Sequence, residues 1–252
     1  MNKILDLSAA VCAIAKEASA LIMCHYANPI THEKKADHSP VTIADQESND
    51  LIVAGLRALT PEISIVSEEG EQAEVTAGEW FWLVDPLDGT LSYIARDDEF
   101  SVNIALIHNR RPVLGVQAIP AKILLYWAAA GDVAYRQIGE AAPEIIRCRT
   151  VPAEGLTVMT SKSHGSARMQ AFLAEYKVAE RVRAGSAYKI TRVAEGSADF
   201  YPRLGPTMEW DTAAGHCILE AAGGSLTTVE GAPFLYGKAG YLNDGFVARG
   251  LV

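Results

Sequence analysis

The chain has 252 residues, of which 49% are hydrophobic and 21% are charged, a balance that is typical of globular proteins and excludes disordered and fibrous classes. Its 31 acidic residues outnumber its 22 basic residues, so the formal net charge is −9. A surface of this charge repels nucleic acid polymers and anionic membranes. A phosphorylated ligand would therefore need local positive charge, such as cations bound by some of the carboxylates.

Apolar residues at helical spacing predict two amphipathic helices, over residues 4–27 and 42–59. The polar stretch between them, residues 31–40, is expected to be a loop. Charged residues at Asp6, Lys16 and Glu17 interrupt the first helix, unlike the core of a signal peptide. No apolar run approaches the roughly 18 residues of a membrane span, so we expect no transmembrane segment.

The cysteines show neither CxxC pairs nor the dense spacing of a disulfide framework. They are Cys12, Cys24, Cys148 and Cys217. We therefore expect reduced thiols and a cytoplasmic protein. Peripheral association with the inner face of the membrane and the choice between a monomer and a homodimer stay open.

Two predicted strands end in acidic residues. Residues 63–66 lead into Ser67-Glu68-Glu69, and the apolar residues 80–84 lead into Asp85-Pro86-Leu87-Asp88-Gly89-Thr90. Open sheets commonly bind ligands at the carboxyl ends of their strands. Pro86 predicts a sharp turn in which the carboxylates of Asp85 and Asp88 and the carbonyl of Leu87 meet. Such an all-oxygen set suits Mg²⁺ or Mn²⁺ rather than Zn²⁺.

The rest of the chain is predicted to contain a meander of strands followed by alternating strands and helices. The meander strands are residues 102–107, 113–119, 124–129 and 133–137. The alternating elements are a strand at 157–160, a helix at 167–175, a strand near 180–183, a helix at 187–195 and a last helix from about 210 to 222. This change of pattern predicts an N-terminal half, residues 1–148, and a C-terminal half, residues 149–252.

Each acidic residue also has an ordinary interpretation. Asp211 precedes a helix, where Asp commonly acts as an N-cap, and Glu68 alone fits a solvated loop acid. If a helical turn begins at Gly89, the backbone N–H groups of Gly89 and Thr90 would form an anion site. The hydroxyl of Thr90 could then orient or deprotonate a water molecule, with Asp45 as the proton acceptor.

The motifs together resemble the signatures of the inositol monophosphatase superfamily. They are Ser67-Glu68-Glu69, Asp85 to Thr90, Trp210-Asp211-Thr212-Ala213-Ala214-Gly215, and Pro40-Val41-Thr42 with Asp45. Within the superfamily the sequence is most similar to bacterial 3′(2′),5′-bisphosphate nucleotidases of the CysQ type. The segments that carry this likeness are residues 35–42, 100–106 and 201–207. The resemblance implies an α/β (α+β) fold of the layered αβαβα sugar-phosphatase type, with two mixed α/β halves.

The resemblance also implies a site and a reaction. It assigns two or three Mg²⁺ ions, replaceable by Mn²⁺ and inhibited by Li⁺, to the metal ligands Glu68, Asp85, the Leu87 carbonyl, Asp88 and Asp211. It assigns catalysis to Thr90, Asp45 and Glu68. It assigns a phosphorylated nucleotide substrate to Asp88, Gly89, Thr90, Ser161, His164, Gly185, Ser186, Lys189, Arg203 and Asp211. The implied reaction hydrolyses the 3′-phosphate of adenosine 3′,5′-bisphosphate to AMP and phosphate.

Two other functions stay open at the level of the sequence. CysQ-type proteins usually carry Lys-Glu after the Gly-Thr of the metal motif, whereas this chain has Leu91-Ser92. That departure keeps an inositol or sugar monophosphatase as the alternative enzyme. A non-catalytic nucleotide or phosphate sensor is disfavoured, because a protein that only binds its ligand does not need the pair formed by Thr90 and Asp45.

Overall fold

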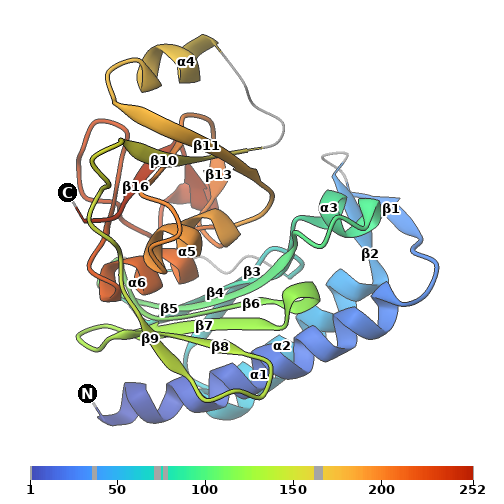
Figure 1. The fold of residues 1–252 in the computed structure, drawn as a ribbon. Coiled ribbons are helices and arrows are strands. Elements are labelled where there is room, and N and C mark those ends of the chain that lie inside the picture. The colour runs from blue at the N-terminus through green and yellow to red at the C-terminus, as the bar shows by residue number, and fades with distance from the viewer. Residues whose placement is uncertain (1, 36–38, 71–74, 76–78, 162–166, 252) are drawn as a thin grey trace.

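The structure is a computed structural model that describes residues 2–35, 39–70, 75, 79–161 and 167–251 (Figure 1). Its helices are α1 (Asn2–Tyr26), α2 (Ile43–Leu59), α3 (Thr90–Ala95), α4 (Ala167–Leu173), α5 (Tyr188–Ala194) and α6 (Ala213–Ala221), with short 3₁₀ turns at Pro120–Lys122 and Ala239–Tyr241. These elements and two large sheets stack in the order helix, sheet, helix, sheet, helix (Figure 1). The predicted layered αβαβα fold is therefore confirmed.

The first sheet has seven strands in sequence order. They are β3 (Ser64–Ser67), β4 (Phe81–Asp88), β5 (Ser101–His108), β6 (Arg111–Ile119), β7 (Leu124–Ala129), β8 (Ala134–Ile138) and β9 (Glu144–Ile146). β3 pairs parallel with β4, and each later pair of neighbours is antiparallel. The predicted meander is confirmed, because strands joined by short turns pair with their sequence neighbours.

The second sheet has five strands in the order β11-β10-β12-β16-β14. They are β10 (Leu156–Ser161), β11 (Val178–Ala184), β12 (Phe200–Arg203), β14 (Ser225–Thr227) and β16 (Phe246–Arg249). Two small pairs complete the strands: β1 (His32–Lys34) with β2 (Pro40–Thr42), and β13 (Thr207–Met208) with β15 (Leu242–Asn243). β10 pairs parallel with both β11 and β12, whereas β16 runs antiparallel to its neighbours.

Separate hydrophobic clusters fill the spaces between the layers. α1 and α2 pack on one face of the first sheet, α5 and α6 lie between the two sheets, and α4 packs with Val158, Phe200 and Val247 beyond the second sheet. The middle cluster takes side chains from both predicted halves of the chain. The boundary between residues 148 and 149 stays a prediction.

The first helix is a core helix of this fold. Its buried residues recur at helical spacing, and they are Val11, Ile14, Ala15, Ala18 and Ile22. This face contacts α2, β6 and β7, and burial of each large apolar side chain stabilises the fold by about 1.5–3 kcal/mol. Among the described residues, Asp6–Tyr26 is also long and apolar enough to span a membrane, with a mean hydropathy of 1.6. The core helix of a globular protein passes the same test of length and composition. The contacts with α2, β6 and β7 account for the buried face of α1.

Two local predictions are wrong. The expected loop at residues 31–40 contains β1 and the start of β2, because His32 pairs with Thr42 across a hairpin. The expected sharp turn after Asp85 is absent, because β4 continues to Asp88 and accommodates these residues in an irregularity of its pairing with β5. The ordinary interpretation of Asp211 as an N-cap does not hold either, because the N-cap of α6 is Thr212 and Asp211 lies one position before it.

Candidate active site

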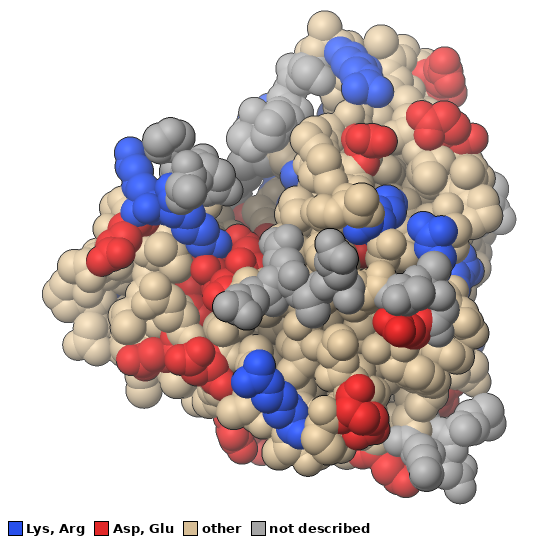
Figure 2. Space-filling model, turned by 180° about the vertical axis from the view of Figure 1, so that it is seen from behind, with Lys and Arg blue, Asp and Glu red and all other residues tan. Residues whose placement is uncertain are grey.

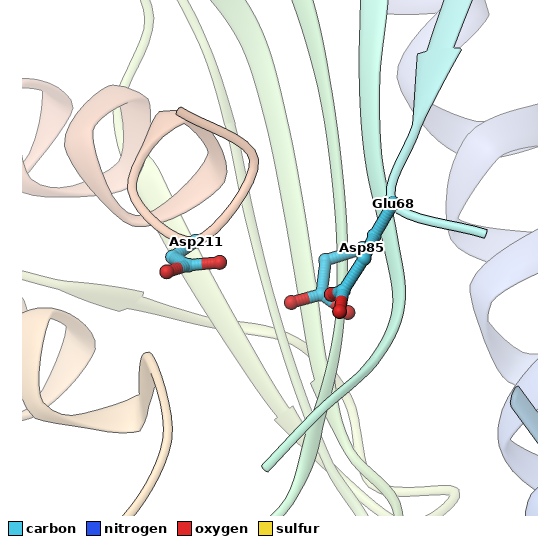
Figure 3. A group of neighbouring side chains, drawn as sticks. All are labelled: Glu68, Asp85 and Asp211. Carbon is cyan, nitrogen blue, oxygen red and sulfur yellow. The ribbon is translucent and has the colours of Figure 1, made fainter. Parts of the chain in front are cut away.

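Three carboxylates from separate parts of the chain meet at the carboxyl end of β4. Glu68 follows β3, Asp85 lies within β4, and Asp211 precedes α6. One oxygen from each side chain lies within 4.8 Å of the others. Figure 3 shows the carboxylates of Glu68 and Asp85 side by side, with Asp211 opposite them on the side of α6. The parallel pairing of β3 with β4 brings the first two together, since Ser67 pairs with Val84.

Within this cluster, Asp85 has no cationic partner among the described residues. Oδ1 of Asp85 accepts the N–H of Leu87 at 3.1 Å, but its buried Oδ2 has no hydrogen-bond partner among the described residues. Burial, and then the charges of Glu68, Asp88 and Asp211, raise the pKa of Asp85 well above its ordinary value. Burial and the charge of Asp88 also raise the pKa of Asp211 to about 7. An unpartnered buried oxygen in an all-carboxylate set fits a divalent cation that prefers oxygen ligands.

Asp88 and Leu87, the other two residues assigned to the metal, lie beside this cluster with hydrogen bonds of their own. Oδ2 of Asp88 accepts the hydroxyl of Ser101 at 3.2 Å and the backbone N–H of Ala187. The carbonyl of Leu87 accepts the hydroxyl of Thr90 at 3.3 Å. Asp88 is still close enough for its charge to raise the pKa of both Asp85 and Asp211. The structure thus brings Glu68, Asp85 and Asp211 together and leaves Asp88 bonded to the C-terminal half.

The proposed water-activating residues contact each other. The hydroxyl of Thr90, the first residue of α3, donates to Oδ1 of Asp45 at 3.0 Å. Oδ2 of Asp45 accepts the backbone N–H of Thr42 at 2.8 Å and its hydroxyl at 2.5 Å. Burial raises the pKa of Asp45, and the hydrogen bonds from Thr42 and Thr90 partly offset that rise. Asp45 is therefore held in one orientation by Thr42, the N-cap of α2.

A cavity of about 420 Å³ adjoins the carboxylates. Of the residues expected to bind substrate, those that line it are Asp88, Gly89, Ser161, Gly185, Ser186, Lys189, Arg203 and Asp211. Thr90 is next to Gly89 but does not line the cavity, and His164 lies outside the described residues. These residues come from both halves of the chain, so the cavity lies where the two halves meet.

Lys189 and Arg203 are the cations of this cavity. The side chain of Lys189 is buried, its ammonium donates to the carbonyl of Ser186, and it lies 5.3 Å from the ring centre of Tyr201. Arg203 donates to the carbonyl of Pro206 from Nε at 3.2 Å and from Nη2 at 2.8 Å. A buried ammonium and a fixed guanidinium suit a phosphate group better than an uncharged ligand.

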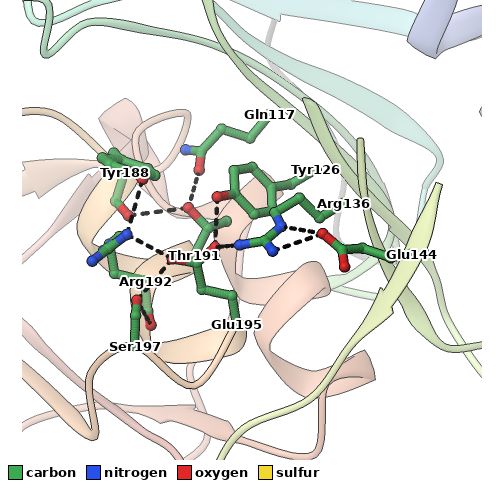
Figure 4. Close-up of polar contacts among 9 residues, drawn as sticks. All are labelled: Gln117, Tyr126, Arg136, Glu144, Tyr188, Thr191, Arg192, Glu195 and Ser197. Atoms are coloured by element: carbon green, nitrogen blue, oxygen red, sulfur yellow. Dashed lines mark hydrogen bonds and ion pairs between the residues drawn. The ribbon is translucent and has the colours of Figure 1, made fainter. Parts of the chain in front are cut away.

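Polar contacts fix α5, the helix that carries Lys189, to the first sheet (Figure 4). The hydroxyl of Thr191 donates to Oε1 of Gln117 at 2.7 Å. Glu195, just after α5, accepts hydrogen bonds from Tyr126 at 2.8 Å and from Arg136 at 2.7 Å. The end of the helix that is remote from the cavity is therefore held by side chains of β6, β7 and β8.

The sequence interpretation gave no role to Lys35, which contacts the metal cluster. Its ammonium donates to Oε1 of Glu68 at 2.9 Å and also to Glu69. Although burial alone lowers the pKa of Lys35, the charge of Glu68 and the bonds to both acids raise it overall. A lysine at the end of a short hairpin carries no local signal for this contact, because the partner is 33 residues away.

Charge on the molecular surface is mixed. On the face drawn in Figure 2, Lys and Arg side chains are scattered among Asp and Glu, and the described residues form no continuous basic surface there. Acidic atoms gather in and beside the hollow of this face. A nucleic acid polymer requires an extended basic surface, and the described residues on this face do not form one.

The chain is similar to known proteins over nearly its whole length. The profile of the inositol monophosphatase family matches residues 5–248. The chain is 41% identical over 241 residues to the 3′(2′),5′-bisphosphate nucleotidase CysQ of Escherichia coli O157:H7, covering 94% of this chain and 96% of that protein. The crystal structure of CysQ from Bacteroides thetaiotaomicron superposes with a TM-score of 0.84 at 34% identity, covering 97% of each chain.

An inositol monophosphatase is also similar in structure. The enzyme from Anabaena (Nostoc) sp. PCC 7120 gives a TM-score of 0.79 at 25% identity, covering 98% of this chain and 91% of that one. The shared fold therefore extends beyond the nucleotidases. With a profile match over nearly its whole length and a relative at 41% identity, the chain belongs to the inositol monophosphatase family.

Proposed function

We propose that the protein is a Mg²⁺-dependent 3′(2′),5′-bisphosphate nucleotidase that hydrolyses the 3′-phosphate of adenosine 3′,5′-bisphosphate to AMP and phosphate. The observation that carries this proposal is the cavity, which joins a carboxylate cluster on one side to the cations Lys189 and Arg203 on the other. A substrate with two phosphates can use both sides. The similarity to CysQ nucleotidases supports the same substrate class.

The proposed metal ligands are Glu68, Asp85, the Leu87 carbonyl, Asp88 and Asp211. When bound there, Mg²⁺ would supply the positive charge that polarises the phosphoryl group and favours attack by water. Mn²⁺ has similar ligand preferences and is expected to substitute. A third ion beside Glu68 and Glu69 would have to compete with Lys35, whose ammonium pairs with both carboxylates.

The protein's own groups would handle the proton and the phosphate. The Thr90 hydroxyl, hydrogen-bonded to Asp45, would accept the proton of the attacking water as it passes its own proton to the carboxylate. Glu68 would help to orient that water. The backbone N–H groups of Gly89 and Thr90 would bind the reacting phosphate, and Lys189 and Arg203 the second phosphate, with Ser161, His164, Gly185 and Ser186 beside the nucleoside.

The alternative enzyme, an inositol or sugar monophosphatase, differs in its substrate. A substrate panel with purified protein and Mg²⁺ distinguishes the two. We expect a higher kcat/KM for adenosine 3′,5′-bisphosphate than for inositol 1-phosphate or fructose 1,6-bisphosphate. The reverse order would reject the nucleotide as substrate while leaving the metal site intact. Inhibition by millimolar Li⁺ in the same assay is expected, and insensitivity would count against the proposed metal positions.

The cellular setting stays a prediction. We propose a cytoplasmic enzyme that acts alone or as a homodimer on a small molecule, with no nucleic acid polymer as partner. Fractionation of cells that express the tagged protein would test this, since recovery in the membrane fraction would instead indicate association with the inner membrane face.

A further inference from the structure

The turn between β11 and α5, residues 185–187, is tied to the N-terminal half at each of its three residues. The N–H of Gly185 donates to Oε2 of Glu99 at 2.5 Å, and the N–H of Ala187 donates to Asp88. The hydroxyls of Ser186 and Ser101 lie 3.1 Å apart. Because Ser186 has a left-handed backbone, with φ of 47°, this turn depends on outside contacts for its shape.

Glu99 lies between this turn and the loop expected to hold the reacting phosphate. A Cβ added to Gly185 would lie 3.1 Å from both Cβ and Oε2 of Glu99, and one added to Gly89 would lie 3.0 Å from its carbonyl oxygen. The added Cβ of Gly89 would also lie 3.3 Å from Cβ of Ser186. Glu99 therefore packs against both glycines, through its carbonyl oxygen at Gly89 and through its side chain at Gly185.

The position of the turn also controls Lys189. The ammonium of Lys189 donates to the carbonyl of Ser186, so a shift of the turn moves the acceptor that orients this cation. The far end of α5 cannot follow such a shift freely, because Thr191 and Glu195 are bonded to the first sheet (Figure 4). A displaced turn would thus separate Lys189 from its carbonyl partner.

We propose that Glu99 is a positioning residue that fixes the spacing between the anion site at Gly89 and Thr90 and the cation Lys189, and so selects substrates with two phosphates. Asp88 also holds the turn, but it belongs to the proposed metal site, and Ser101 is bonded to Asp88. The side chain of Glu99 can be removed without changing Asp88 or Ser101. This proposal rests on the proposed nucleotidase function.

The test compares adenosine 3′,5′-bisphosphate with adenosine 3′-phosphate, which lacks the second phosphate. Glu99→Ala should lower kcat/KM for the bisphosphate roughly 10- to 100-fold, as expected for loss of a hydrogen bond to a charged group, and chiefly through KM. Its kcat/KM for the monophosphate should stay within about threefold. Glu99→Gln keeps an acceptor oxygen and should restore most of the discrimination.

Asp98→Ala is the matched control, because Asp98 is the neighbouring residue and bonds to Tyr26 at 2.8 Å, away from the turn. Asp98→Ala should leave the ratio of kcat/KM for the bisphosphate to kcat/KM for the monophosphate unchanged. If Glu99→Ala lost kcat/KM equally for both substrates, the positioning role would be overturned. The same holds if Asp98→Ala changed the ratio of the two kcat/KM values as much as Glu99→Ala does. A wild-type enzyme that does not distinguish the two substrates would also overturn it, whereas one that hydrolyses neither would reject the nucleotidase function itself.

Discussion

The hydroxyl of Thr90 donates a hydrogen bond to Oδ1 of Asp45 at 3.0 Å, across 45 residues of sequence. The acceptor is fixed in turn by the backbone N–H and the hydroxyl of Thr42. In the proposed mechanism, this contact would give a proton leaving the attacking water a defined route to a buried carboxylate. A binding protein would gain nothing from such a route, so the pair supports an enzyme over a sensor.

The first prediction concerns this pair. Thr90→Ala should lower kcat about 100-fold, because general acid–base groups typically contribute 10²- to 10⁴-fold. Thr90→Ser keeps the hydroxyl and should retain activity within about tenfold of wild type. The measurement is kcat for the bisphosphate at saturating Mg²⁺, with thermal unfolding as the check on folding. Wild-type kcat in Thr90→Ala would remove this pair from the mechanism.

The second prediction concerns Asp85, whose charge is expected to be needed for turnover and to lower the stability of the metal-free protein. Asp85→Asn should abolish turnover, because it removes a charge from the proposed metal set. The same change relieves repulsion with Glu68 and Asp211, so the metal-free variant should be more stable than metal-free wild type by about 1–2 kcal/mol. That gain corresponds to a rise in Tm of about 2–6 °C for a chain of this size.

The Asp85→Asn variant is measured in EDTA and again in Mg²⁺. Wild type should gain stability from Mg²⁺, and the variant should gain much less. A variant that remained active, or that lost stability in EDTA, would contradict the view that these carboxylates are held together against their own repulsion.

The third prediction is the pH dependence of metal binding. The folded-state pKa of Asp211 is raised to about 7, from about 3.9 in an unfolded chain. A carboxyl with a raised folded-state pKa stabilises the metal-free protein fully below about pH 4, and this contribution is lost as the pH rises through 7. Mg²⁺ binds the ionised form, so the rise in Tm caused by Mg²⁺ should be larger at pH 8 than at pH 6. Equal shifts at both pH values would contradict this linkage.

Much of the fold follows from local patterns. The helical spacing that predicts α1 and α2, and the short turns that predict the meander from β5 to β8, act between residues close in sequence. Short strands with distant partners were not predicted: β12 pairs with β16, joining Phe200 to Arg249, and no strand was expected after residue 222. Two-to-four-residue strands carry too little periodicity to be identified without their partners.

The candidate site, like the fold, could be predicted from the sequence only in part. The motifs around Glu68, Asp85 and Asp211 identified the carboxylates that the structure brings together. The contacts of Lys35 with Glu68 and of Glu99 with Gly185 were missed, since they join residues 33 and 86 positions apart and no local pattern links the two partners. Sequence patterns report which groups carry the chemistry, whereas the residues that position them are visible only once the chain is folded.

The last prediction concerns the stability of the C-terminal half. The carboxylate of Asp199 is fully buried and accepts hydrogen bonds from Nε of Arg149 at 2.8 Å, Nη2 of Arg149 at 2.9 Å and the N–H of Thr157 at 2.7 Å. Burial alone would raise its pKa, but the bonds from Arg149 and Thr157 lower it overall. Asp199→Asn should lower the free energy of unfolding at pH 7 by about 2 kcal/mol, less than for a fully buried pair because Arg149 is 37% exposed.

The sign of the pH effect makes this prediction specific. A carboxyl with a lowered folded-state pKa contributes stability that is present above its unfolded value of about 3.9 and is lost as the pH falls through the folded value. Urea unfolding should therefore show a gap between wild type and Asp199→Asn at pH 7 that narrows towards pH 3. Glu144→Gln is the control, because Glu144 pairs with Arg136 at 2.7 Å but is 52% exposed, and its gap should be below about 1 kcal/mol. A gap for Asp199→Asn that is the same at pH 7 and pH 3 would mean that this carboxylate contributes through packing and not through its charge.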